Sequence, residues 1–184
     1  MSTVARLTIA QYEKMIDSGV FDQERRIELI RGELREMSPL GIPHEYSVDV
    51  LATWSHDNTP RDRVWVRIQN SIALDQIGTV PQPDIVWLAL GDYSSRRPRP
   101  ADVLLIIEVS DSSLAYDRDE KASLYAQAAI QDYWIVNIPD RCVEVRRRPI
   151  DTVYQNVRVY GEHESVRPLR LPELSFPVSV LFGT

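Results

Sequence analysis

The sequence has a single cysteine, Cys142, and no long apolar run. One thiol excludes an intrachain disulfide framework and a cysteine metal cluster, so we expect Cys142 to be a buried strand residue. No segment approaches the roughly 20 apolar residues of a membrane-spanning helix. The N-terminal residues, MSTVARLTIAQYEK, also lack the apolar stretch of a signal peptide. The sequence therefore predicts a cytoplasmic protein with no membrane association.

Positive charge is also scarce, and lysine is its scarcest form. The chain carries 21 Lys and Arg against 27 Asp and Glu, a net charge of −6. This balance argues against a protein that coats nucleic acid nonspecifically, because phosphate binding draws on positive surface. All basic residues except Lys14 and Lys121 are arginines, which favour bidentate phosphate contacts. A lysine at position 121 in such a sequence indicates a role for a compact ammonium group.

A strand, a helix and a second strand in residues 102–136 organise the predicted fold. An unbroken apolar run over 103–107 is typical of a strand that is buried on both faces, and Glu108 follows it directly. Because side chains alternate along a strand, Glu108 points the same way as Ser110. A polar turn then leads into a helix that we expect to begin near Tyr116 or Asp117.

One lysine lies on the inward face of this helix. The packed face is a stripe at helical spacing made of Asp117, Lys121, Leu124, Tyr125 and Ala128. Lys121 is therefore expected to face the sheet and not water. When a helix folds back over the preceding strand, its second helical turn lies level with the strand residue two or three positions before the connecting loop. We infer that Lys121 and Glu108 approach each other at the end of the sheet.

The other segments complete an α/β fold, a mixed sheet flanked by helices with an αβββαβ core. Length and composition predict one domain over residues 1–184. The patterns predict a helix over 8–18 and a helix from His44 to about Trp54. They predict one strand within 61–74, one that begins at Asp84 and one over 133–138. They also predict a hairpin within 26–37 and a C-terminal hairpin of 142–148 and 153–160, with Arg146 to Arg148 at the tip of the second. The apolar tail, 171–182, returns to the core or covers a second subunit, and on this basis we predict a homodimer.

Two acids are placed where strands of the predicted sheet begin or end. Asp84 opens a strand after Pro83, which fits only at a strand start or edge, and Glu108 ends another. Two carboxylates brought together repel each other unless a cation lies between them, and oxygen ligands suit Mg²⁺, with Mn²⁺ as an alternative. Such an ion clamps a phosphoryl oxygen and lowers the pKa of bound water, while the ammonium of Lys121 offsets developing negative charge. The set predicts phosphodiester hydrolysis, with Asp84 and Glu108 as metal ligands.

Two further residues and one loop each have two interpretations. Glu28, in the first hairpin, is either a charge on a strand edge or an auxiliary member of the site. His44, on the packed side of its helix, is either a structural histidine or a second auxiliary residue. The loop over 91–100 is either a solvated connector or, through its arginines, a phosphate contact.

Four segments form a specific set, and together they cover most of residues 8–184. They read IELIRGELREMSP followed by His44, PQPDIVWL, LLIIEVSDSS and YDRDEKASLYAQAAIQDYWIVNI. The set resembles the Uma family of bacterial restriction-endonuclease-like proteins. The resemblance implies the PD-(D/E)xK nuclease fold and Mg²⁺ on Asp84 and Glu108, which stand at the acidic positions of that motif.

The chain departs from the superfamily motif at Ser110, where a lysine would stand. The resemblance implies that this lysine has moved to the helix as Lys121, in agreement with the stripe. The favoured hypothesis is a Mg²⁺-dependent nuclease that cuts DNA, with His44 or Glu28 assisting. One alternative is an inactive nuclease-fold protein that binds nucleic acid or a protein, which the acidic balance favours. Another is a hydrolase of a smaller phosphorylated substrate.

Overall fold

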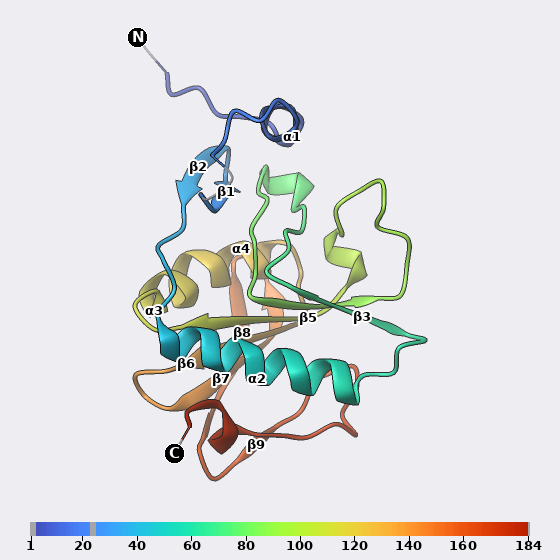
Figure 1. Cartoon of the computed structure of the whole chain (residues 1–184), viewed down its shortest axis with the longest axis vertical. Helices are drawn as coiled ribbons and strands as arrows, with labels where there is room; N and C mark the ends of the chain where they lie inside the picture. Colours follow the sequence, from blue (N-terminus) through green and yellow to red (C-terminus); the bar gives the residue numbers. More distant parts are fainter. Residues whose placement is uncertain (1–2, 23–24, 184) are drawn as a thin grey trace.

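A six-stranded mixed sheet forms the centre of the molecule in the computed structural model, which describes residues 3–22 and 25–183 (Figure 1). Its strands lie in the order of the chain: β3 (Val64–Ile68), β4 (Ile85–Ala89), β5 (Val103–Ser110), β6 (Asp132–Asn137), β7 (Cys142–Ile150) and β8 (Val153–Gly161). Only β5 and β6 are parallel neighbours, and the other pairs are antiparallel. A parallel pair needs a crossover connection, which is the helical segment that carries Lys121.

Helices cover both faces of this sheet, as Figure 1 shows. The long helix α2 (Ile42–Asn58) packs on one face, where Leu51 contacts a core that includes Trp87 and Trp134. The other face is covered by α3 (Leu114–Tyr116), the π-helical turn η3 (Asp117–Lys121) and α4 (Ala122–Gln127). Because side chains alternate across each strand, each central strand contributes side chains to the cores on both faces of the sheet. The predicted mixed sheet with an αβββαβ core is confirmed.

Several boundaries differ from the predicted ones. Helix α2 begins at Ile42, not at His44, because Pro43 is favoured in the first helical turn, where its missing N–H costs nothing. The helix after β5 begins at Leu114 and passes through a π-helical turn. The last hairpin turns beyond Ile150, so the expectation of Arg146 to Arg148 at its tip is wrong: these arginines lie within β7. A left-handed residue at the turn, Asp151 with φ 52°, allows the tight reversal.

The N-terminal helix and hairpin lie at one end of the molecule (Figure 1). Helix α1 (Ile9–Asp17) starts at Thr8, which forms a reciprocal capping box with Gln11. Strands β1 (Ile27–Ile30) and β2 (Glu33–Glu36) form the predicted hairpin, with Arg31 and Gly32 at positive φ.

This hairpin is a separate two-stranded sheet, not an extension of the central one. One link to the rest of the chain is a bridge between Leu29 and Val80, which with Tyr12 form a small third core. The hairpin is also held by backbone hydrogen bonds of Gly32 with Leu7 and Gly78, and Ile30 is buried in the core beneath α4.

The C-terminal tail packs on its own chain. It forms β9 (Ser165–Val166), β10 (Phe176–Pro177) and the 3₁₀ turn η4 (Val178–Leu181), and Phe176, Val178 and Leu181 are buried in the core beneath α2. These residues need no second subunit to cover them, so the homodimer stays a prediction without the support of the tail. Cys142 is a buried free thiol, as expected.

The contacts of the arginine-rich loop favour its interpretation as a connector. Its three arginines are paired with acids of the same chain: Arg96 with Asp102, Arg97 with Glu13 and Arg99 with Asp75. The 3₁₀ turns η1 (Asp75–Ile77) and η2 (Pro100–Asp102) supply two of these acids.

Within the described ranges, no helix is both long and apolar enough to cross a bilayer.

Candidate active site

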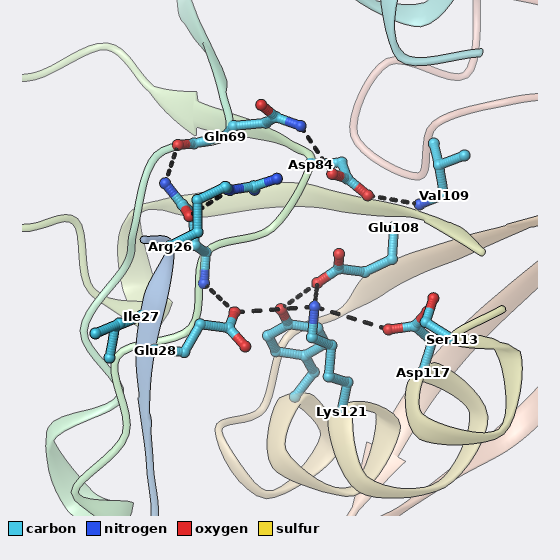
Figure 2. A network of polar contacts seen from close by, with 12 residues as sticks. Arg26, Ile27, Glu28, Gln69, Asp84, Glu108, Val109, Ser113, Asp117 and Lys121 are labelled. Atoms are coloured by element: carbon cyan, nitrogen blue, oxygen red, sulfur yellow. Dashed lines mark hydrogen bonds and ion pairs between the residues drawn. The ribbon is translucent and has the colours of Figure 1, made fainter. Parts of the chain in front are cut away.

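All five residues predicted for the site line one cavity of about 360 Å³. They are Glu28, His44, Asp84, Glu108 and Lys121, and each is nearly or fully buried. The cavity is bounded by the first hairpin, the start of α2, the end of β5 and the π-helical turn, segments far apart in the sequence. Figure 2 shows four of these residues within one network of polar contacts.

The expected approach of Lys121 to Glu108 is confirmed. The Lys121 ammonium is buried, and its Nζ lies 3.0 Å from Glu108 Oε1. It also lies 3.7 Å from Asp117 Oδ1 and 3.9 Å from Glu28 Oε1 (Figure 2). The π-helical turn ends at this lysine, a feature that is frequent at functional sites. One ammonium group is thus shared by three carboxylates.

Asp84 is held in place from three directions. Its Oδ2 accepts a hydrogen bond from the backbone N–H of Val109 at 2.9 Å and lies 3.1 Å from His44 Nε2, while its Oδ1 accepts from Gln69 Nε2 at 3.3 Å. Asp84 precedes β4 and Val109 is in β5, so the pairing of these strands brings the two acids, Asp84 and Glu108, to one end of the sheet. His44 sits above them in the first turn of α2.

Glu28 belongs to the cavity, and its interpretation as a charge on a strand edge is wrong. Its side chain is only 3% exposed, and its Oε1 accepts a 2.6 Å hydrogen bond from the backbone N–H of Gln82. Glu33, by contrast, is partly exposed and pairs with Arg6 and Arg35. The bridge between the hairpin and the chain before β4 turns Glu28 inward.

Two further residues contact the site without having been predicted as members of it, Asp117 and Tyr125. Tyr125 donates its hydroxyl to Glu108 Oε1 at 2.6 Å. Asp117 accepts from the hydroxyls of Ser110 and Ser113 at 2.7 and 2.6 Å. Asp117 and Tyr125 each lie four residues from Lys121 in the inward stripe. The presence of an acid on a packed helix face could have indicated that Asp117 belongs to the site. Ser110, at the position of the motif lysine, therefore orients an acid.

Burial and the crowd of acids shift the pKa of the two predicted metal ligands in opposite directions. Burial raises the pKa of Glu108 to about 8, an effect that Lys121 opposes and Asp84 reinforces. Burial also disfavours ionised Asp84, but the hydrogen bond and charge of His44, with Lys121 and the Val109 N–H, hold the pKa of Asp84 below its usual value. Although burial alone would lower the pKa of Lys121, its acidic neighbours, with Glu108 the strongest, raise it well above the usual value. Lys121 is therefore a cation at neutral pH.

The oxygen donors of the site suit Mg²⁺ in kind. Both polar contacts of Glu108 found in the described chain involve Oε1, which leaves Oε2 for another ligand. No group of three or more His, Cys, Asp or Glu within 3–22 and 25–183 is placed to hold a metal ion. Mg²⁺ is commonly bound by one or two carboxylates and keeps several waters. An ion on Asp84 and Glu108 would therefore keep most of its waters and would not lie in a closed protein cage.

Known proteins support the fold and the family. Residues 9–179 match the Uma2 family, described as "Putative restriction endonuclease". A solved structure from Anabaena variabilis, described as a "putative nuclease belonging to DUF820", superposes with a TM-score of 0.71 and 14% sequence identity. The superposition covers 96% of this chain and 97% of that one, and at this identity it shows the shared fold alone. No curated protein matches the sequence. With the family match spanning nearly its whole length, the chain belongs to the Uma2 family of restriction-endonuclease-like proteins.

Proposed function

We propose that this protein is a metal-dependent nuclease that hydrolyses DNA phosphodiester bonds. The observation that carries the proposal is the buried ammonium of Lys121, 3.0 Å from Glu108, in the cavity that Asp84 also lines. Two acids beside a lysine at the end of a sheet are groups that can hold a metal ion and stabilise the negative charge that develops in phosphodiester hydrolysis. Membership of a restriction-endonuclease-like family supports a nucleic acid as the partner.

Each residue has a role that follows from its contacts. Asp84 and Glu108 would hold Mg²⁺ or Mn²⁺, which when bound polarises a phosphoryl oxygen and lowers the pKa of a bound water. Lys121 would orient the attacking water and offset the negative charge that develops on the phosphate. His44, 3.1 Å from Asp84, would keep that carboxylate in one orientation, so we class it as a positioning residue.

Glu28 has a different auxiliary role. It is 3.9 Å from the Lys121 ammonium, and its other contact is a backbone N–H. We propose that it keeps Lys121 protonated and fixes the position of its ammonium. Because this contact is long, Glu28 should matter less than Glu108.

One observation favours the alternative, an inactive protein that binds nucleic acid or a protein partner. Lys121 is surrounded by three carboxylates, and the net charge of the chain is −6. A lysine so fully paired offers little to a phosphate unless a metal ion draws the acids away from it. The alternative therefore predicts binding without cleavage.

Cleavage of supercoiled plasmid by the purified full chain, in Mg²⁺, Mn²⁺ and EDTA, tests the proposal. We expect nicking that requires a divalent ion and falls at least about 100-fold in Asp84→Asn and in Lys121→Met. Glu162→Gln, which changes an acid paired with Arg141 outside the cavity, is the matched control and should cut like the wild type.

Thermal unfolding of every variant separates loss of chemistry from loss of fold. A folded wild-type protein that nicks plasmid in neither metal would contradict the nuclease. If the same protein binds labelled duplex DNA and shows no divalent binding by calorimetry, the inactive alternative is supported. Metal binding without DNA cleavage would instead point to a smaller phosphorylated substrate.

A further inference from the structure

Strand β3 lies at one edge of the central sheet, and three large side chains follow one another along one of its faces (Figure 1). Trp65 is directly opposite Leu88 in β4. Arg67 is directly opposite Val86, and both β4 residues belong to the core beneath α4. Because directly opposite residues point to the same side of a sheet, Trp65 and Arg67 point to this side as well. Arg63, two residues before Trp65, shares it by alternation, and we call the three side chains the β3 face.

The β3 face is open to solvent and already ordered. The Trp65 side chain is 46% exposed, although tryptophan is on average a highly buried residue. Its indole meets the ring of Tyr93 edge to face, with centroids 5.8 Å apart and an interplanar angle of 67°. Arg63 is exposed and Arg67 is partly exposed. A flat ligand that stacks on this indole would therefore find it held in position.

Neither arginine of the β3 face has an acidic partner. In the described part of the chain, the Arg63 and Arg67 guanidinium groups form no ion pair, and their one polar contact joins Arg67 Nη2 to Asn70 Oδ1 at 3.2 Å. Partial burial lowers the pKa of Arg67 below its usual value, and the charge of Arg97 lowers it further. A positive charge beside a second one, with no acid to neutralise it, favours the binding of an anion.

A ligand has room beside Arg67. This residue lines an open hollow of about 540 Å³, together with two further arginines, two serines and a tyrosine of the loop after β4: Tyr93, Ser94, Ser95, Arg96 and Arg97. Two acids of α1, Glu13 and Asp17, also line the hollow. Glu13 accepts two hydrogen bonds from Arg97, at 2.6 and 3.1 Å, so its charge is neutralised. Guanidinium and hydroxyl donors thus outnumber the acids, which suits a phosphate group.

The chain leads directly from the β3 face to the candidate active site. Gln69 comes two residues after Arg67, roughly 7 Å further along the chain, and its side chain donates to Asp84 Oδ1 at 3.3 Å. The backbone N–H of Gln69 also donates to the carbonyl oxygen of Asp84, at 2.8 Å. A polymer that lies along β3 would therefore run towards the end of the sheet that carries Asp84.

We propose that the β3 face binds single-stranded DNA, with Arg63 and Arg67 on backbone phosphates and a base stacked on Trp65. Aromatic side chains on a positively charged surface bind single strands in this way without reading their sequence. A duplex offers its phosphates to the arginines, but its bases stack on one another and not on an indole. The proposal deepens the proposed function, on which it rests for the identity of the polymer as DNA.

Binding of a labelled single-stranded oligonucleotide to the full chain, followed by fluorescence anisotropy in EDTA, tests the β3 face separately from cleavage. In Trp65→Ala we expect the dissociation constant to rise at least about fivefold, because a base loses its stacking partner. Trp65→Phe keeps an aromatic ring and should recover most of the affinity. Thermal unfolding of each variant shows whether it is folded.

The salt dependence of the same binding tests the two arginines. Removal of one phosphate contact should reduce the slope of log K against log salt concentration by about 0.7, in Arg63→Gln and in Arg67→Gln. Arg158 is an exposed arginine of β8 that pairs with Glu164. Arg158→Gln therefore has the same change in charge away from the β3 face, and its slope should equal that of the wild type.

A duplex of the same sequence separates stacking from phosphate contact. We expect Trp65→Ala to weaken binding of the single strand and to leave duplex binding nearly unchanged. Arginine variants that weaken both forms, with no effect of Trp65→Ala on either, would overturn the proposal that a base stacks on this face.

The two proposals fail in different ways. Wild-type protein that does not cut DNA but binds single strands through Trp65 refutes the nuclease and leaves the β3 face. Wild-type protein that cuts, with unchanged affinity and salt slope in Trp65→Ala and Arg67→Gln, refutes the β3 face and leaves the nuclease. If Trp65→Ala does not fold, Trp65→Leu keeps apolar bulk without a flat ring and should still weaken single-strand binding at least about threefold; undiminished binding would overturn the inference.

Discussion

Two groups of buried acids lie at opposite ends of the parallel strands β5 and β6, and they are neutralised very differently. At the start of β6, fully buried Asp132 accepts from Arg147 Nε at 2.7 Å, from Trp134 Nε1 at 3.1 Å and from the N–H of Leu169 at 2.7 Å. One acid there meets one cation, with further donors on both oxygens. Its contacts join the sheet to the C-terminal tail.

At the far end of β5 the charges do not balance. Four buried acids surround the single ammonium of Lys121: Glu28, Asp84, Glu108 and Asp117. Four acidic side chains therefore share one ammonium group, so acids outnumber cations here. Removal of one partner from a balanced buried pair is strongly destabilising, whereas an unbalanced buried group is costly to keep and suits a site that would take up a cation. We therefore expect Asp132 to be a structural acid and the acids around Lys121 to serve the proposed site.

Removal of the balanced acid should have the largest effect on stability. Asp132→Ala leaves Arg147 and the N–H of Leu169 without their acceptor, and we expect it to lower the free energy of unfolding by about 3–5 kcal/mol. Urea denaturation measures this loss, and DNA cleavage per folded molecule should be unchanged. Glu162→Ala, at the surface, should not move the midpoint. A folded Asp132→Ala protein with normal stability and no cleavage would reverse the assignment.

Glu108→Gln should have the opposite pair of effects. Cleavage should fall at least about 100-fold, because a metal ligand is lost. The free energy of unfolding at pH 8 should rise by at least about 1 kcal/mol, because one excess buried charge is removed. Plasmid nicking and urea denaturation on the same preparation check both. Lower stability together with full activity would mean that Glu108 is a structural acid.

The gain from Glu108→Gln should depend on pH. Burial raises the pKa of Glu108 from 4.5 to about 8, so between these values the folded state binds a proton that the unfolded state releases. The contribution of Glu108 to stability is therefore lost as pH rises through this window. The difference in unfolding free energy between the variant and the wild type should grow from pH 5 to pH 8 and then level off. A constant difference across this range would contradict the shifted pKa.

Glu144 is an intermediate case and should show the smallest effect. It is buried in β7, and burial would raise its pKa, but hydrogen bonds from Arg118 and Arg146 outweigh burial and hold the pKa below its usual value. Two cations for one acid predict a structural role for Glu144. Its contribution to stability should be small, because Arg118 is partly exposed. We expect Glu144→Gln to cost about 1 kcal/mol in thermal unfolding, with cleavage near that of the wild type. A loss as large as that of Asp132→Ala would show that local charge balance does not rank these acids.

The sequence predicted the parts of the site that follow from local periodicity. An acid at the end of an apolar strand and a lysine on a helical stripe were enough to bring Glu108 and Lys121 together, and the structure gives 3.0 Å. The same stripe contained Asp117 and Tyr125, but a helical pattern shows only which face is inward, not which polar groups will bond there. The αβββαβ succession of the core followed from the number and type of its segments, whereas the order of the strands within the sheet was not predicted.

What the sequence could not predict depends on contacts between distant segments. Glu28 is turned inward by the bridge between Leu29 and Val80, which no local pattern encodes. Arg26 acquires its position through Gln82, 56 residues away. The tail was ambiguous for the same reason, because an apolar stretch alone does not specify whether its own core or a partner covers it.

The two-stranded hairpin of β1 and β2 forms one side of the cavity. It carries Glu28 and is separate from the central sheet, and its contacts with the rest of the chain include the Leu29–Val80 bridge, the N–H of Gln82 and the burial of Ile30. Such a segment can open as a unit at a much lower free energy than global unfolding. Amide hydrogen exchange should therefore be faster in 27–36 than in β5 and β6. Opening of the hairpin would expose the Lys121 ammonium while the six-stranded sheet stays intact, and would give the proposed DNA substrate a path into the cavity.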